Sequence, residues 1–240
     1  MLILSLDTCN SRGSAALLRD DRVLRCAVHE AEEEYSVWLL NAVEGILRTE
    51  SVAWKDIEVF AVVTGPGSFT GLRVGLTTAK GLAEVCGKKI AAVPRLEALA
   101  SMRPPEGDWV AVAVEGGRGE IYCALYRRVG GELKLEGQEC VLAAEEFLNR
   151  VARAVPDGGV IWCTPGTERI AALEGWAERA ALGDKLENAD VALAPAVGKI
   201  GYALARAGKL VDALALDANY IRRPDAERFW EGARAGGHAR

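Results

Sequence analysis

A glycine-rich run has the residue types that a protein needs to hold an anion. It extends from Thr64 to Gly75, reads TGPGSFTGLRVG, and lies between a short apolar strand pattern and a long helical pattern. Gly65 and Gly67 allow backbone angles that are closed to other residues, and Ser68 or Thr70 could cap the helix that follows. The free amides of a helix start attract phosphate. The run lacks the Gly-Lys-Ser/Thr ending of a Walker A motif, so it fits either a nucleotide loop or a capped turn without a ligand.

Two carboxylates end buried strand patterns in corresponding places of the two halves. Asp7 ends the first strand pattern, and Glu115 ends the first strand pattern of the second half. In a cleft between two lobes, either could hold a cation or a sugar hydroxyl; a turn-forming carboxylate is an equal alternative. Thr8, next to Asp7, could bind phosphate. We therefore expect weak nucleotide contacts, if any, at Asp7, Thr8, Gly65, Gly67 and Ser68.

The scarcity of histidine excludes a clustered histidine metal site. The chain has two histidines, His29 and His238, and no Gly-x-Ser-x-Gly nucleophile elbow, so we expect neither a metal nor a catalytic triad. Six cysteines are dispersed without a Cys-x-x-Cys motif, which indicates reduced thiols in a reducing compartment: Cys9, Cys26, Cys86, Cys123, Cys140 and Cys163.

The composition is that of an ordinary soluble domain. Hydrophobic residues make up 50% of the 240 residues, the formal net charge is −5, and the pI is near 5.3. This acidity argues against a free-standing nucleic-acid-binding protein, although a subunit of a larger RNA-modifying complex remains compatible with it. The beginning lacks the pattern of a signal peptide, and no stretch is long and apolar enough for a membrane span. We expect a cytoplasmic protein.

The order of strand and helix patterns repeats in the two halves. Each half opens with a strand ending in a carboxylate, continues through an Arg-Gly turn into two antiparallel strands, and then adds helices. The expected strands of the first half are 2–6, 14–19, 22–28, 59–63 and 90–93, with helices at 36–48, 70–86 and 95–102. The second half begins with strands at 109–114, 120–127 and 132–140. This duplication suggests an α/β protein with the two-lobed, actin-like and sugar-kinase-like ATPase fold, each lobe opening with a three-strand meander. Any two-domain α/β protein with repeated hairpins is an equal alternative at this point.

The best linker candidate sets the expected boundaries. Met102–Gly107 combines two prolines with charged residues and a glycine. We expect a first lobe at 1–103, with the glycine loop, and a second lobe at 104–223. Residues 224–240, rich in Gly, Ala and Arg, are expected to form a flexible tail.

With these features in hand, the chain resembles the TsaB (YeaZ) family, the bacterial partner subunits of the machinery that transfers threonylcarbamoyl to tRNA. The resemblance spans roughly Leu2 to Arg223 and rests on these stretches: Asp7-Thr8, Gly65–Gly75, Pro94–Leu99, Glu115–Tyr122 and Asn219–Arg223. It departs from the family pattern at Glu115, where Asp is common, and at Ala218, where proline is usual.

The resemblance implies a non-catalytic subunit. The catalytic paralogue, TsaD, holds a metal through His-x-x-x-His, and the comparable positions here are Arg95 and Leu99. Neither side chain ligates a divalent cation, so the resemblance implies that the partner carries the metal and the chemistry. It implies heterodimerisation with TsaD, contact with the ATPase subunit TsaE through the complex, indirect contact with tRNA, and no membrane. ATP or ADP could bind at the complex interface.

A stripe of small residues suggests where the partner binds. Gly71, Gly75 and Ala79 recur every four residues along the predicted helix, and small side chains allow another helix to approach closely. The expected interface contains Trp38, Leu39, Gly71, Leu72, Gly75, Leu76 and Ala79, and the same patch would form a homodimer of the free protein. The alternative is that the stripe packs against the protein's own sheet.

A different function class also fits the fold. An independent small-molecule kinase or phosphotransferase would use Asp7 or Glu115 as base or cation ligand and the glycine loop for phosphate. Turnover by the purified chain alone would distinguish this alternative from a partner subunit. A metallopeptidase, the third alternative, is weakened by the number of histidines.

Overall fold

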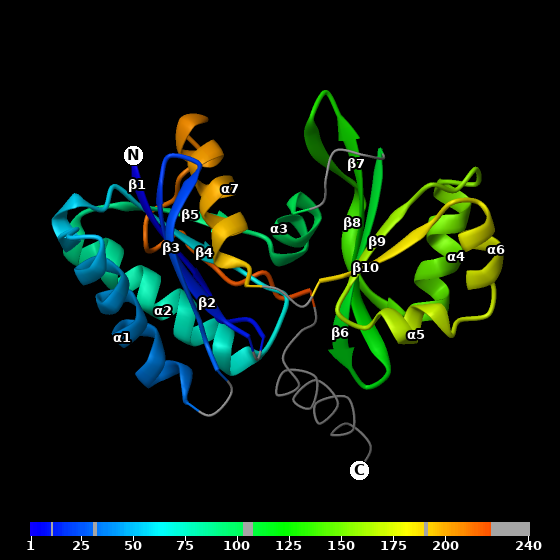
Figure 1. Cartoon of the computed structure of the whole chain (residues 1–240), viewed down its shortest axis with the longest axis horizontal. Coiled ribbons are helices and arrows are strands. Elements are labelled where there is room, and N and C mark those ends of the chain that lie inside the picture. The colour runs from blue at the N-terminus through cyan, green and yellow to red at the C-terminus, as the bar shows by residue number, and fades with distance from the viewer. Residues whose placement is uncertain (11, 31–32, 103–107, 190–191, 222–240) are drawn as a thin grey trace, which may run out of the picture.

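The computed structural model describes residues 1–10, 12–30, 33–102, 108–189 and 192–221. It has two lobes, each built on a five-stranded sheet (Figure 1). The first sheet has the order β3-β2-β1-β4-β5, in which β1 to β3 are antiparallel and β4 and β5 run parallel to β1. Its strands are β1 (Leu2–Asp7), β2 (Ser14–Arg19), β3 (Arg22–Val28), β4 (Val59–Val63) and β5 (Lys89–Val93).

Helices cover both faces of the first sheet. On one face lie α1 (Tyr35–Thr49) and α2 (Phe69–Cys86), and on the other lies α7 (Ala194–Arg206), as Figure 1 shows. Sheets covered on both faces have strands that read as continuous apolar runs, and β1 and β4 are buried along their whole length. The first lobe also contains the short η1 (Trp54–Asp56) and α3 (Arg95–Ser101), which faces the second lobe.

The second sheet repeats the connectivity of the first. Its order is β10-β9-β6-β7-β8, in which β6 to β8 are antiparallel and β9 and β10 run parallel to β6. The duplication and the predicted two-lobed actin-like fold are therefore confirmed. The elements are β6 (Trp109–Gly117), β7 (Glu120–Val129), β8 (Glu132–Ala143), α4 (Ala144–Ala154), β9 (Ile161–Thr164), α5 (Thr167–Ala171), α6 (Trp176–Ala181) and β10 (Lys185–Asn188).

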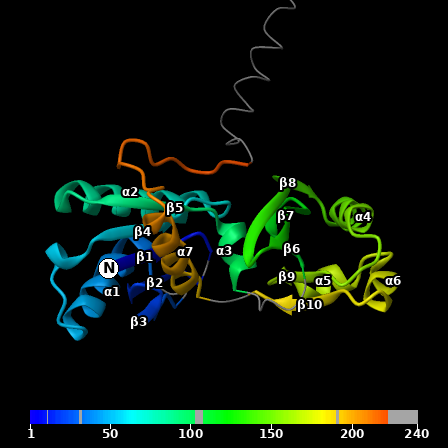
Figure 2. The same ribbon diagram turned by 90° about the horizontal axis from the view of Figure 1, so that it is seen from above.

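The expected second lobe at 104–223 is wrong in its last part. The chain returns to the first lobe at α7, which packs on β1, β2, β4 and β5 (Figure 2). Gly198 and Gly201 allow this close approach, because a side chain at these positions would collide with Leu18 and with Ala61. Val211 then pairs with Ile90 at the edge of β5. The second sheet with its helices thus occupies 108–189, and the predicted tail at 224–240 lies outside the described residues.

Most predicted elements are confirmed, with differences at their ends. The strands β6, β7 and β8 each run two or three residues further than expected. Ser36 is not a cap, because α1 begins at Tyr35. Its N-cap residue is Glu34, whose side chain makes no capping bond. Ser68, not Thr70, caps α2. None of the helices in the described part of the chain has the length and apolar character needed to cross a bilayer.

Candidate functional site

The glycine loop packs tightly on the residues that follow β1. The amide of Ser68 donates to the carbonyl oxygen of Cys9 at 2.9 Å, and the hydroxyl of Thr8 donates to the carbonyl oxygen of Gly71 at 2.6 Å. A side chain at Gly67 would overlap Cys9, and one at Gly71 would overlap the carbonyl of Thr8. The glycines are therefore required by contact between two segments of the same chain.

The C-terminal segment covers the other side of the loop. The amide of Asn219 donates to Thr64 O at 2.7 Å, and the ring of Tyr220 stacks on Phe69 with centroids 5.2 Å apart. The space left between this segment and the loop residues Pro66 and Gly67 is about 10 Å³. That is the volume of about one water probe, far less than a phosphate group needs.

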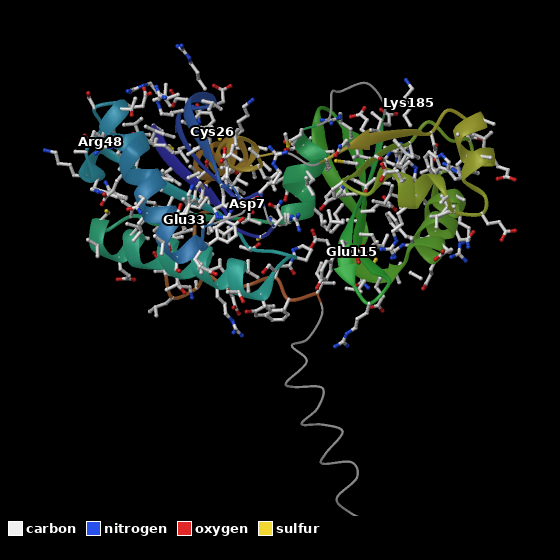
Figure 3. All side chains as sticks on the ribbon, turned by 60° about the horizontal axis from the view of Figure 1, so that its bottom comes forward. Asp7, Cys26, Glu33, Arg48, Glu115 and Lys185 are labelled. Carbon is white, nitrogen blue, oxygen red and sulfur yellow. The ribbon has the colours of Figure 1, made fainter. Side chains whose placement is uncertain are left out.

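Asp7 lies beneath the loop as a buried carboxyl group. Its Oδ1 accepts a hydrogen bond from the amide of Cys9 at 2.9 Å, and its Oδ2 has no partner among the described residues. Burial raises the pKa of Asp7, and the nearby charge of Arg95 opposes this rise. Figure 3 shows Asp7 in the first lobe and Glu115 in the second. Asp7 is fully buried, so the expectation that it points into an open cleft is wrong.

Arg95 holds the loop from the first turn of α3. Its backbone amide donates to Gly65 O at 2.7 Å, and its guanidinium donates to Pro66 O at 3.2 Å. The side chain is buried, and its Nε has no partner among the described residues. Thus, a fixed cation lies beside Asp7 at the position compared above with a metal-binding histidine. Among the described residues, no group of three or more His, Cys, Asp or Glu side chains could hold a metal.

An aromatic side chain closes the turn between β1 and β2. The hydroxyl of Tyr35 accepts from the amide of Gly13 at 2.7 Å and donates to the carbonyl oxygen of Asn10, and its ring occupies the space beside Gly13. The rings of His29 and Tyr35 lie 4.2 Å apart. The sequence analysis did not identify Tyr35 as a site residue. The only pattern that could have indicated it was an aromatic residue at the start of a predicted helix.

Glu115 has a different role from Asp7. Its Oε2 forms an ion pair with Arg169 at 2.5 Å, and its Oε1 accepts the amide of Gly117 at 3.0 Å. The carboxylate is exposed and stabilises the turn after β6, which is the alternative role that the sequence left open.

A hollow of about 650 Å³ lies between β7, β8, the start of α3 and the C-terminal segment. It is lined by residues such as Pro94, Glu97, Tyr126, Leu133, Glu139 and Asn219.

The structure brings the five expected nucleotide residues together and packs other described segments of the chain against the loop. Asp7, Thr8, Gly65, Gly67 and Ser68 converge where β1, β4 and α2 meet. Side chains and backbone of the chain itself occupy both sides of this loop. A nucleotide contact at these residues therefore stays a prediction.

The predicted partner interface is wrong for six of its seven residues. The stripe packs against the chain's own β4 and Thr8, which was the alternative stated for it. Six of the expected interface residues, on α1 and α2, are buried: Leu39, Gly71, Leu72, Gly75, Leu76 and Ala79. Trp38 is half-buried against His29. The exposed apolar residues of α1 are instead Val37 and Leu40, at 54% and 45% exposure.

Comparison with known proteins identifies the family. The model described as "TsaD: tRNA N6-adenosine threonylcarbamoyltransferase" matches residues 29–175. The chain is 32% identical to an Escherichia coli protein named tRNA threonylcarbamoyladenosine biosynthesis protein TsaB, over 70% of this chain and 71% of the relative. This chain belongs to the TsaB (YeaZ) family. A Bacillus subtilis protein of the same name is 35% identical over 56% of this chain and 58% of the relative, so the match spans little more than half of that protein.

Solved structures agree with the family and the fold. The structure titled "YeaZ from Pseudomonas aeruginosa" superposes with a TM-score of 0.72 and 30% identity, covering 91% of this chain and 99% of that one. A second Pseudomonas aeruginosa structure, described as similar to the peptidase YeaZ, gives a TM-score of 0.75 and 28% identity over 92% and 99% of the two chains. The resemblance drawn from the glycine loop and the second hairpin is therefore confirmed.

Proposed function

We propose that this TsaB-family chain is a non-catalytic subunit that supports threonylcarbamoyl transfer to the adenosine next to the anticodon of tRNA. It would act in the cytoplasm as a heterodimer with its catalytic paralogue, TsaD. The names of its relatives, which refer to threonylcarbamoyladenosine biosynthesis, support this pathway. The match of a TsaD family model to 29–175 supports a paralogous partner with the same fold.

The observation that carries the non-catalytic role is the placement of Arg95. A guanidinium is a permanent cation without a lone pair for a metal, and here it bonds to Pro66 O instead of facing an open site. The glycine loop beside it is covered by Asn219 and Tyr220. An active phosphotransferase needs free loop amides and an accessible carboxylate, so this geometry favours a subunit whose partner supplies the metal, the nucleotide and the substrate.

The first-lobe helices remain our proposed pairing surface, with different contact residues. Val37 and Leu40 project from α1 on the outside of the first lobe, where Figure 1 places α1 and α2 side by side. Exposed apolar side chains on one helix favour helix-to-helix contact, and the same surface would allow a homodimer of the free chain. TsaE would join through the complex, tRNA would be contacted indirectly, and ATP or ADP would bind at the complex interface.

The decisive experiment is reconstitution with and without this chain. Purified TsaD, TsaE, tRNA and threonylcarbamoyl-adenylate should produce modified adenosine at a much higher rate when the chain is added, as measured by mass spectrometry of tRNA nucleosides. Depletion in cells should lower threonylcarbamoyladenosine without changing the synthesis of the adenylate upstream. An unchanged rate in the complete mixture would refute the proposal, and ATP-dependent phosphoryl transfer by the chain alone would establish the kinase alternative.

A further inference from the structure

Two cysteines face each other across neighbouring strands of the second sheet. Cys123 on β7 and Cys140 on β8 are directly paired in the antiparallel register, and their sulfur atoms lie 3.6 Å apart. Cys123 is fully buried, whereas Cys140 is only half-buried. The two thiols are therefore neighbours with different access to solvent.

The surroundings of the pair favour one thiolate. The guanidinium of Arg150, on α4, donates to Cys140 Sγ at 3.3 Å. The hydrogen bond from Cys123 lowers the pKa of Cys140 to about 7, and the positive charge of Arg150 also lowers it. Burial and the negative charge of Glu146, also on α4, oppose the change. The same hydrogen bond raises the pKa of Cys123, together with burial. Of the two thiols, Cys140 therefore loses its proton first, and Cys123 keeps its proton.

We propose that Cys123 and Cys140 form a dithiol that reacts with hydrogen peroxide, in which Cys140 is the nucleophile and Cys123 is the resolving thiol. The geometry gives Cys140 a partly exposed position with its sulfur bonded to the cation of Arg150, and it places the sulfur of Cys123 against that of Cys140. This site lies on the second lobe, apart from the glycine loop, and is independent of the proposed role in tRNA modification.

The reaction has two balanced steps. First, the thiolate of Cys140 attacks one oxygen of the peroxide; an S–O bond forms, the O–O bond breaks, and the leaving hydroxide takes a proton to become water. Second, Cys123 loses its proton and attacks the sulfur of the sulfenic acid, forming the disulfide and releasing a second water. The two thiols are oxidised by two electrons, and one peroxide is reduced to two waters.

The local backbone can accommodate the product. A disulfide requires the two sulfur atoms to approach by about 1.5 Å from their 3.6 Å separation. The ladder between β7 and β8 shifts register between Cys123 and Leu125, immediately beside the pair. Such irregularities interrupt the regular hydrogen bonding of a ladder, so the strands can adjust there at a lower cost than in a continuous ladder.

The first test measures which cysteine is reactive. The native full-length chain is treated with iodoacetamide across a range of pH values, and the labelled tryptic peptides 119–127 and 135–150 are quantified separately by mass spectrometry. Cys140 should be half-maximally reactive near pH 7. At pH 7 it should be alkylated roughly five- to tenfold faster than Cys26. Cys26 is the control because it is an exposed residue and partial desolvation of its thiol raises its pKa. Equal rates for Cys140 and Cys26 would overturn the proposal.

The second test follows oxidation. Hydrogen peroxide should link peptides 119–127 and 135–150 through a disulfide that dithiothreitol reverses. Cys123→Ser should stop at the sulfenic acid of Cys140 or go on to the sulfinic acid, Cys140→Ser should leave Cys123 unreacted, and Cys26→Ser should behave like the wild type. Arg150→Met should move the pH midpoint of Cys140 upward while the circular dichroism spectrum stays native. Failure of the wild type to form the disulfide, or its formation through Cys26, would overturn the proposal.

Discussion

The glycine at position 75 gives the sharpest test of how α2 is packed. A β-carbon added at Gly75 would overlap the hydroxyl oxygen of Thr8. That hydroxyl is buried and bonded to Gly71 O at 2.6 Å, so it can move away only by losing its hydrogen bond. Overpacking of a well-packed site costs about 1–3 kcal/mol, and the lost hydrogen bond adds about 1 kcal/mol. The higher helix propensity of alanine relative to glycine offsets about 1 kcal/mol of this destabilisation.

We therefore expect Gly75→Ala to lower the free energy of unfolding by about 1–3 kcal/mol. For a chain of this size, each kcal/mol corresponds to a fall in Tm of about 2–4 °C. Gly81, on the same helix, has nothing within 4 Å of an added β-carbon, so Gly81→Ala is the matched control and should raise stability by up to about 1 kcal/mol. Thermal melting followed by circular dichroism measures both variants.

A second substitution isolates the contact. Thr8→Ala removes the hydroxyl that the added methyl would meet. The double variant should therefore lose less free energy of unfolding than the two single variants together, by at least about 1 kcal/mol. If the stripe were instead an exposed partner surface, Gly75→Ala would stabilise the chain as Gly81→Ala does. A stable Gly75→Ala variant with weakened partner binding would refute the packing described here.

Three further predictions concern the partner surface, the second core and a carboxyl group between the lobes. Val37→Glu with Leu40→Glu should weaken co-purification with the catalytic paralogue at an unchanged Tm, because both side chains are exposed; undiminished pairing would move the interface elsewhere. Arg179→Met should cost about 3–5 kcal/mol in urea unfolding, because it leaves the buried carboxylate of Asp184 without its bidentate partner; a loss below about 1 kcal/mol would contradict this. Burial raises the pKa of Glu139 above its usual 4.5, so ionisation costs more in the folded state, and its contribution to stability should fall as pH rises from about 4.5 through the raised pKa. Glu139→Gln should flatten that part of the pH–stability curve, and an unchanged slope would exclude Glu139 as its source.

Local patterns were sufficient to predict the repeated architecture. The buried strands read as apolar runs that end in Asp7 and Glu115, and the turns between them carry glycine, so the opening meanders and the duplication follow from short-range signals. The repetition suggested the actin-like fold, and the family resemblance favoured it over other two-domain α/β arrangements. These signals could not predict on which lobe α7 packs, because the amphipathic pattern of a helix shows that one face is buried but not which sheet buries it.

The same limit explains the errors at the site. A stripe of small residues at helical spacing is identical in sequence whether it meets a partner or Thr8 of the same chain. The charge that acts on Asp7 comes from Arg95, which follows it by more than eighty residues, and the covering of the glycine loop depends on Asn219 and Tyr220. Contacts between segments so distant in sequence leave no periodic pattern to read.

The return of the chain to the first lobe has a consequence for the order in which the protein is assembled. Ser5 on β1 donates to Ala194 O at 2.7 Å, and Ala194 donates back to Ser14 on β2 at 2.9 Å. During translation, β1 and β2 leave the ribosome long before this partner exists, so one face of their sheet stays uncovered while 108–189 are synthesised. The second lobe can complete its sheet first. The first lobe, although begun earlier, is completed last, and its nascent sheet is the surface that a chaperone would have to shield.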